Sequence, residues 1–278
     1  MASFPSGLVW LASYPKSGNT WMRVLLANLL SAREEPADIN NLSDHEPLMG
    51  RWRFADDMLV DPDLLHWREL QRIRPIQCDH AATSLTEPFF CKTHDRFEGQ
   101  DGQPVLGKAA RAALYLVRDP RDVAISLAHH ASISVDDAID WMNDPTRMSG
   151  GELQLPYLLG DWSGHVQGWT EQALVPTLIL RYENMRRDTA KTVRDVVAFL
   201  GGQADAAEIH RAVHHSSLEE LQRQEATKGF RESRPGQERF FRSGRVGEWR
   251  DVLNPAQLQA IEGHFAPTML RWGYDLSC

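Results

Sequence analysis

Short runs of consecutive apolar residues alternate along the chain with stretches of helical periodicity. A short apolar run indicates a strand buried on both faces, and apolar positions three to four residues apart indicate a helix. The runs lie at residues 8–12, 89–92, 112–117 and 176–181, and the helical stretches at 21–30, 122–130 and 189–200. Gly201-Gly202 gives a C-cap signal after the last stretch. This alternation predicts an α/β fold with a central, mostly parallel sheet flanked by helices.

Three further segments shape the expected architecture. Ser216-Ser217-Leu218-Glu219 has the form of a capping box and predicts the start of another helix. Residues 33–62 hold scattered acids and several prolines, which predicts a long, partly ordered excursion. Residues 227–247 are rich in Gly and Arg, and a loop of this length is usually functional or mobile. A chain of 278 residues is expected to form one domain, residues 1–278.

The charge balance excludes some classes of partner. The chain carries 30 Lys and Arg against 38 Asp and Glu, a formal net charge of −8. A protein that coats nucleic acid or an anionic membrane needs a basic surface, so we expect neither partner. Hydrophobic residues make up 42% and charged residues 24%, which excludes wholesale disorder. Small anionic ligands stay possible, because they respond only to the local field.

Cysteine usage and the N-terminus bear on the compartment. Three cysteines without a CxxC pair are too few for a disulfide framework, which favours a reducing environment. The N-terminal segment lacks a charged region, and its apolar run is too short for a signal core. No stretch approaches the length needed to cross a bilayer. The expectation is a cytoplasmic protein.

The segment between the first strand and the first helix has the chemistry of an anion site. Lys16, Ser17, Gly18, Asn19 and Thr20 offer an ammonium, hydroxyls, an amide and backbone N–H groups at a helix N-terminus. Gly18 permits a close approach of the main chain to a ligand. The loop is not a Walker A motif, because Lys16 precedes Gly18. An ordinary strand-to-helix turn with a solvated lysine is the alternative.

A second group of residues follows the third predicted strand. Arg118 lies at the carboxyl end of that strand, where open α/β sheets bind ligands, and Ser126 follows one to two turns into the next helix. Asp119 allows a competing interpretation as the metal carboxylate of a Walker B motif. The missing Walker A motif makes that the weaker alternative.

Four segments together resemble the soluble, cytosolic-type sulfotransferases that use 3′-phosphoadenylyl sulfate (PAPS). YPKSGNTW at 14–21 resembles their 5′-phosphosulfate loop, and VRDPRDVAIS at 117–126 resembles their 3′-phosphate motif. RYENMRRD at 181–188 is similar to the segment after their fourth core strand. FFRSGRVGEWR at 240–250 resembles their C-terminal nucleotide loop. The resemblance spans residues 8–272 and implies a P-loop-like three-layer fold.

The resemblance implies PAPS as sulfuryl donor, 3′-phosphoadenosine 5′-phosphate (PAP) as product, and no metal. The residues it assigns to the nucleotide are Lys16, Ser17, Gly18, Asn19, Thr20, Trp21, Arg118, Ser126, Tyr182, Ser216, Leu218, Phe241, Arg242, Ser243 and Gly244. Trp21 would stack on the adenine, although a core-facing aromatic is an alternative role. Ser216 and Leu218 differ in type from the family pattern, and Ser243 replaces its usual lysine. That last change removes one positive charge, for which Arg245 is a candidate compensation.

The resemblance also implies the catalytic residues. Phe90-Cys91-Lys92-Thr93-His94 has the form of the family's Lys-Thr-His after the second core strand. His94 would take the acceptor proton as general base, since a His titrates near neutral pH. Lys16 would stabilise the leaving phosphate oxygen, and Lys92 would assist at the transferring group. His129-His130 and His214-His215 carry no comparable signal.

The remaining assignments concern the acceptor and the oligomer. Residues 33–75 and 129–170 are expected to surround a small-molecule acceptor, and 227–247 to cover the nucleotide. Residues 247–250 resemble the start of the family's dimer segment, but its Thr-Val pair is gone, so a monomer or a homodimer is possible. The competing hypotheses are a small-molecule kinase that uses ATP and Mg²⁺, and a nucleotide-binding scaffold without catalysis.

Overall fold

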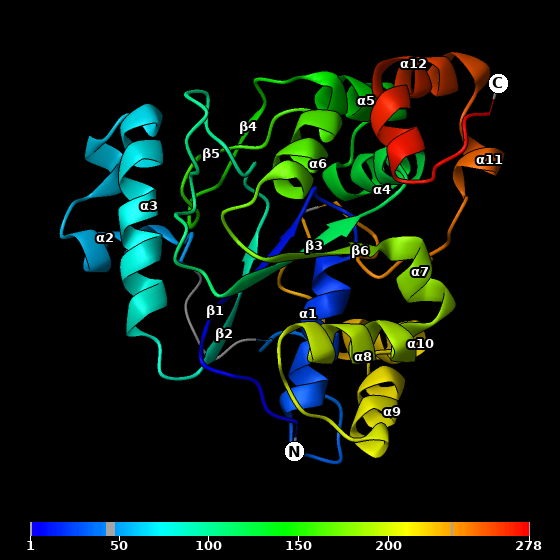
Figure 1. Ribbon diagram of the computed structural model, residues 1–278. Coiled ribbons are helices and arrows are strands. Elements are labelled where there is room, and N and C mark those ends of the chain that lie inside the picture. The colour runs from blue at the N-terminus through cyan, green and yellow to red at the C-terminus, as the bar shows by residue number, and fades with distance from the viewer. Residues whose placement is uncertain (1, 43–47, 235, 278) are drawn as a thin grey trace.

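A four-stranded parallel sheet forms the centre of the computed structural model, which describes residues 2–42, 48–234 and 236–277 (Figure 1). Its strands are β1 (Gly7–Ser13), β2 (Pro88–Thr93), β3 (Ala112–Val117) and β6 (Thr177–Arg181). Their order in the sheet is β2-β1-β3-β6, and all neighbouring pairs are parallel. The four predicted apolar runs are these four strands, so the predicted α/β fold with a parallel sheet is confirmed.

Helices follow or separate the strands. They are α1 (Asn19–Leu30), α2 (Arg51–Met58), α3 (Trp67–Ser84), α4 (Pro120–Ala131), α5 (Val135–Asn143), α6 (Trp162–Glu171), α7 (Tyr182–Arg187), α8 (Thr189–Phe199), α9 (Ala206–His215), α10 (Leu218–Lys228), α11 (Trp249–Val252) and α12 (Pro255–Arg271). A 3-10 turn spans Pro62–Leu64, and β4 (Met148–Ser149) pairs with β5 (Tyr157–Leu158) as a short antiparallel hairpin.

The side chains of the sheet alternate between two cores. Trp10 and Tyr115 belong to a cluster that includes Trp169 of α6 and Phe265 of α12. Leu11 and Leu114 face the other way, into a cluster with residues of α1, α8 and α9. Figure 1 shows the resulting three layers, with α4, α5, α6 and α12 on one side of the sheet and α1, α8 and α9 on the other. Burying one such large side chain stabilises the fold by about 1.5–3 kcal/mol.

The start of α10 and two long connecting segments were also predicted from the sequence. The N-cap of α10 is Ser217, whose side chain accepts from the N–H of Glu220, so the capping box placed at Ser216 was wrong by one residue. The segment 33–62 contains α2 in addition to irregular backbone, and its residues 43–47 lie outside the described part. No helix or strand interrupts the described residues between α10 and α11, as expected for 227–247.

The parallel sheet places four chain segments at one edge. Because all four strands run in the same direction, the residues that follow them meet at the carboxyl edge of the sheet. Those residues include Tyr14, His94, Arg118 and Tyr182. Among the described residues, the helices are too short or too polar to cross a bilayer.

Candidate active site

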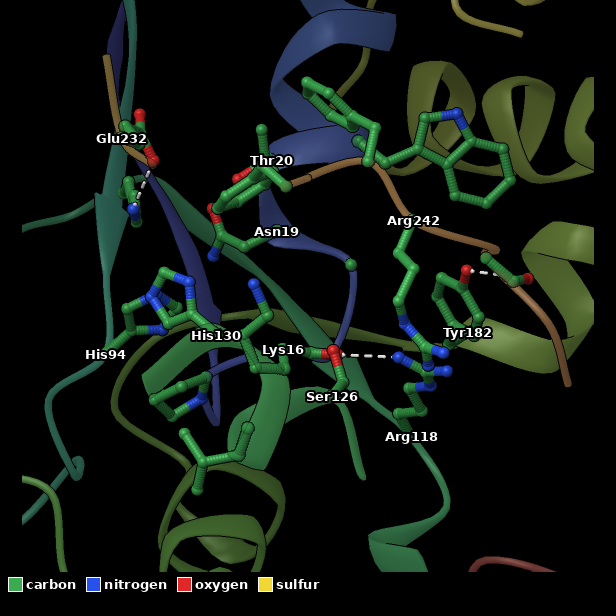
Figure 2. A pocket seen from close by; sticks show the side chains of 18 of the residues that line it. Lys16, Asn19, Thr20, His94, Arg118, Ser126, His130, Tyr182, Glu232 and Arg242 are labelled. Atoms are coloured by element: carbon green, nitrogen blue, oxygen red, sulfur yellow. Dashed lines mark hydrogen bonds and ion pairs between the residues drawn. The ribbon is translucent and has the colours of Figure 1, made fainter. Parts of the chain in front are cut away.

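A cavity of about 340 Å³ opens at the carboxyl edge of the sheet. It gathers residues from the first loop, β2, α4, α7, α10 and the segment before α11. Every site residue predicted above lines it except Ser17 and Ser216. Figure 2 shows Arg118, Tyr182 and Arg242 together at one end, and His94 and Glu232 at the other. We name these ends after the ligands that the sequence predicts for them, the first the nucleotide end and the second the acceptor end.

The loop before α1 is shaped to receive an anion. Gly18 has φ 104° and is the N-cap of α1, with no side-chain hydrogen bond to the first turn. A Cβ on Gly18 would lie 2.8 Å from Cδ2 of Tyr182, so the tight turn and the aromatic ring together require glycine here. The Oγ of Ser17 is buried and has no hydrogen-bond partner within the described chain. An uncapped helix N-terminus beside an unused hydroxyl fits a phosphate or sulfonate group.

The side-chain amide nitrogen of Asn19 stabilises the conformation of this loop. Its Nδ2 donates to the carbonyl of Leu11 at 2.7 Å and lies 3.3 Å from Oγ of Ser13. The amide therefore ties the start of α1 to the end of β1. The hydrogen bond to Leu11 therefore fixes the position of the loop relative to the carboxyl edge of the sheet.

Lys16 lies against an aromatic ring inside the cavity. Its Nζ is 4.0 Å from the centroid of the Phe240 ring, and its own φ is 68°. Burial, followed by the charges of Lys92 and Arg118, lowers the pKa of Lys16 to about 7. A bound anion would favour the charged form of this lysine and raise that pKa again.

Arg118 joins the first loop to the last. It donates to the carbonyl of Lys16 at 3.0 Å and to the carbonyl of Arg245 at 3.1 Å. Its guanidinium lies 4.4 Å from the centroid of the Tyr182 ring. Asp122, one turn along α4, accepts from the N–H groups of Gly247 and Trp249. The second motif thus fixes the C-terminal loop over the cavity.

The C-terminal loop supplies the rest of the nucleotide end. Arg242 forms a two-point ion pair with Glu248, with one contact of 2.6 Å, and Ser243 Oγ lies 3.5 Å from the same carboxylate. The hydroxyl of Tyr182 donates to the carbonyl of Gly244 at 3.1 Å. Ser126 and Phe241 line the same cavity, as does Leu218 at the start of α10.

Trp21 and Ser216 are connected by a hydrogen bond. Nε1 of Trp21 donates to the carbonyl of Ser216 at 2.9 Å, and its ring contacts Tyr182 edge to face. The hydroxyl of Ser216 is buried and lies 3.1 Å from Nδ2 of Asn28. Ser216 therefore stands behind the cavity wall, where it positions Trp21.

His94 is held in one tautomer by the end of β1. Its Nδ1 is 2.7 Å from the carbonyl oxygen of Ser13, which can only accept, so Nδ1 carries the proton. Burial and the charge of Lys92 lower the pKa of His94 well below its usual value. The imidazole is therefore neutral near pH 7, with Nε2 as a lone-pair acceptor on a residue that lines the cavity.

Glu232 and His130 are among the lining residues that the sequence did not single out. The carboxylate of Glu232 lies 2.9 Å from Nζ of Lys92 and pairs also with Arg23 of α1. Although burial raises its pKa, these two cations lower the pKa of Glu232 to about 2. His130, set aside as a bystander, lines the cavity beside Phe240, and burial together with nearby cations lowers its pKa to about 3. Its spacing of four from Ser126 on one helix was the available signal.

Asp119 does not face the cavity as a metal carboxylate. Both of its oxygens contact Arg121, at 2.9 and 2.7 Å, and it caps α4 by accepting from the N–H of Arg121. Arg121 pairs in turn with Glu262 of α12. The carboxylate that a kinase would need for Mg²⁺ is thus committed to a buried network.

Comparison with protein families gives one match across nearly the whole chain. The model of the sulfotransferase domain family covers residues 7–273. Luciferin sulfotransferase of Photinus pyralis is 27% identical over 265 residues, which span 88% of this chain and 66% of that protein. Sulfotransferase 1A1 of Bos taurus is 24% identical over 99% of this chain and 88% of that protein. Cytosolic sulfotransferase 17 of Arabidopsis thaliana is 25% identical over 91% and 72%.

Solved structures share the fold. Mouse sulfotransferase SULT7A1 complexed with PAP superposes with a TM-score of 0.61 at 20% identity, covering 95% of this chain and 85% of that one. Retinol dehydratase in complex with androsterone and inactive cofactor PAP gives a TM-score of 0.63 at 22% identity, over 94% and 80%. At these identities the likeness establishes the three-layer α/β architecture.

Proposed function

This chain belongs to the sulfotransferase domain family, and from that premise we propose that it transfers a sulfuryl group from PAPS to a hydroxyl or amine of a small-molecule acceptor. The family and enzyme class expected from the four motifs are confirmed, and the sulfotransferase hypothesis is favoured over the kinase. One observation carries the proposal: a single cavity joins an uncapped helix N-terminus and Lys16 to the neutral imidazole of His94.

We assign the nucleotide to the end of the cavity that holds Lys16, Trp21, Arg118, Tyr182 and Arg242. The backbone N–H groups of residues 18–20 and the hydroxyl of Thr20 would bind the 5′-phosphosulfate at the start of α1. Arg118 and Ser126 would bind the 3′-phosphate, and Trp21 with Tyr182 would hold the adenine. The hydrogen bonds of Arg118 to the carbonyls of Lys16 and Arg245 support this assignment, because they connect the first loop to the C-terminal loop.

With a hydroxyl acceptor, the reaction exchanges one sulfur–oxygen bond for another. The acceptor oxygen attacks sulfur in line, its proton passes to Nε2 of His94, and the bond from sulfur to the 5′-phosphate oxygen breaks. The leaving oxygen keeps the electron pair of that bond, and the ammonium of Lys16 stabilises its charge. Lys92 would neutralise the transferring group. To do so, its ammonium must leave the carboxylate of Glu232 and bind the sulfonate oxygens instead.

The acceptor would enter beside His94. Residues 129–170 contribute Trp141, Ser149, Gly150, Gln154 and Tyr157 to the cavity wall. The described part of 33–75 contributes none of the lining residues, but α3 packs behind the segment that carries His94. Retinol dehydratase has been solved with androsterone and with retinol. We propose a similarly small acceptor here, and a cytoplasmic location like that named for the Arabidopsis relative.

The direct test is transfer from labelled PAPS in the presence of EDTA. A panel of phenols, aliphatic alcohols, sugars and amines serves as acceptors, and ATP with Mg²⁺ replaces PAPS in a parallel series. We expect labelled product from PAPS and none from ATP. Phosphoryl transfer from ATP without any sulfuryl transfer would overturn the proposal, and PAP binding without turnover on any acceptor would favour the scaffold.

A further inference from the structure

The residue after His94 carries a fully buried charge. The carboxylate of Asp95 lies 2.6 Å from NH1 of Arg74, and each side chain is only 1% exposed. Arg74 comes from α3, which precedes β2 in the chain and covers this part of the sheet. An ion pair without solvent therefore lies directly behind the proposed general base.

Further hydrogen bonds fix the backbone around the same residue. The second carboxylate oxygen of Asp95 accepts from the hydroxyl of Thr93 at 2.7 Å, and Nε1 of Trp169 donates to the carbonyl of Asp95 at 2.9 Å. Nε2 of His165 lies 3.2 Å from the carbonyl of His94. Since that carbonyl only accepts, His165 is protonated at Nε2, and its Nδ1 accepts from the hydroxyl of Tyr115 at 2.8 Å.

Stability does not account for this arrangement. Desolvation of two buried charges cancels much or all of their attraction, so an apolar pair of similar volume is often as stable. What an ion pair adds is direction, because a guanidinium and a carboxylate must meet in a defined geometry. The geometry it defines here is that of the backbone from Thr93 to Asp95, and hence the position of the imidazole between them.

We propose that the buried Arg74–Asp95 pair is a positioning unit for His94, which holds the imidazole against Ser13 so that Nε2 faces the acceptor. The inference rests on the proposed function in one respect, the role of His94 as general base. A displacement of about 1 Å at a reacting group can cost about 100-fold in rate. Loss of the pair should therefore act on turnover far more than on nucleotide binding.

The main test replaces the pair with apolar residues in the double variant Arg74→Met/Asp95→Leu. We expect kcat to fall about 10- to 100-fold, with PAP affinity within about twofold of wild type by calorimetry. The acid limb of the kcat/KM profile should move up towards pH 6.5, because a loosened imidazole regains solvent. Arg74→Lys keeps the charge but loses the planar fork of the guanidinium, so kcat should fall several fold, less than in the double variant. If the double variant folds poorly, this variant carries the test, and an unchanged kcat and acid limb would overturn the inference.

A matched control breaks another buried ion pair away from His94. Glu262→Gln removes one of the two carboxylate partners of Arg121, the one that joins α4 to α12, where the side chains of Glu262 and Arg121 are 9% and 3% exposed. Its effect should be confined to the free energy of unfolding, with kcat and the acid limb unchanged. An equal loss of kcat in this control would show that the Arg74–Asp95 variants act through general destabilisation, and would overturn the inference.

A His94→Ala background separates the inference from the proposed function. If His94→Ala retains turnover, the assignment of the base fails. If His94→Ala abolishes turnover while Arg74→Met/Asp95→Leu keeps the wild-type kcat and acid limb, only the positioning role fails. If the pair acts through His94, the triple variant should match His94→Ala within about twofold in residual rate, since coupled residues are not additive. A further 10- to 100-fold loss would place the action of the pair elsewhere.

Discussion

The two lysines of the cavity show how its ends differ. Lys16, at the nucleotide end, has an aromatic ring beside its ammonium and a pKa of about 7. Lys92, at the acceptor end, lies 2.9 Å from the carboxylate of Glu232. A bound anion would therefore supply the first negative charge next to the ammonium of Lys16. The ammonium of Lys92 already pairs with Glu232, and it would have to leave that carboxylate to bind a ligand. Among the described residues, Lys92 therefore has a carboxylate partner and Lys16 has none.

Replacing each lysine with methionine should give the largest losses of activity. The two variants should differ in PAP affinity, which would distinguish the two ends of the cavity. Lys16→Met removes the cation next to the leaving oxygen, so kcat/KM should fall about 100- to 1,000-fold and PAP should bind more weakly. Lys92→Met should lower kcat while leaving PAP affinity within a few fold. Steady-state kinetics with labelled PAPS and calorimetry with PAP measure both quantities. Equal losses of PAP affinity in the two variants would contradict the division of the cavity.

Gly18→Ala should damage the nucleotide end alone. Its Cβ would collide with Tyr182, and φ 104° strains any residue with a side chain. We expect a loss of about 1–3 kcal/mol in the free energy of unfolding and at least tenfold weaker PAP binding. Gly263→Ala in α12 is the control, because nothing lies within 4 Å of its Cβ. That variant should bind PAP normally and gain about 0.5–1 kcal/mol in stability.

The pH dependence of PAP binding should reveal the depressed pKa of Lys16. As pH rises through about 7, free Lys16 loses its proton, while the bound anion favours the protonated form. Affinity should therefore fall above pH 7 by up to about tenfold per unit, with proton uptake on binding. Calorimetry in buffers of different ionisation enthalpy measures that uptake. Lys16→Met removes the titrating group, so an unchanged uptake in this variant would exclude Lys16 as its source.

Glu232→Gln should have the smallest effect on PAP affinity, and it should raise that affinity where the other variants lower it. Removing this carboxylate takes away the negative charge that neutralises Lys92 and Arg23, so PAP should bind about two- to fivefold more tightly at low salt. The gain should shrink as ionic strength rises. Glu238→Gln, at an exposed position in the same segment, is the matched control and should change little. Weaker PAP binding in Glu232→Gln would show that its ion pairs are needed to hold the cavity in shape.

The sequence predicted the sheet, and it picked out most of the residues that line the cavity around Arg118, because both depend on local signals. The run from Ala112 to Val117 is a strand over those same residues, and the loop around Gly18 requires a backbone conformation that few residues adopt. The acceptor end was less predictable. Glu232 meets Lys92 across 140 residues, and Arg74 meets Asp95 from a helix with no motif. Such pairs are set by tertiary packing, and one sequence carries no signal of their partnership.

The two hydrogen bonds of Arg118 have a consequence for the synthesis of the protein. They connect a carbonyl at residue 16 to one at residue 245, and Asp122 binds the N–H groups of residues 247 and 249. All four strands of the sheet have been synthesised once β6 is complete, but the cavity cannot close until about nine-tenths of the chain has emerged. A chain that stops before residue 245 would lack the C-terminal wall of the cavity and also Phe265 of α12, which packs in the core with Trp10 and Tyr115. The last residues to be synthesised therefore complete the cavity and this part of the core together.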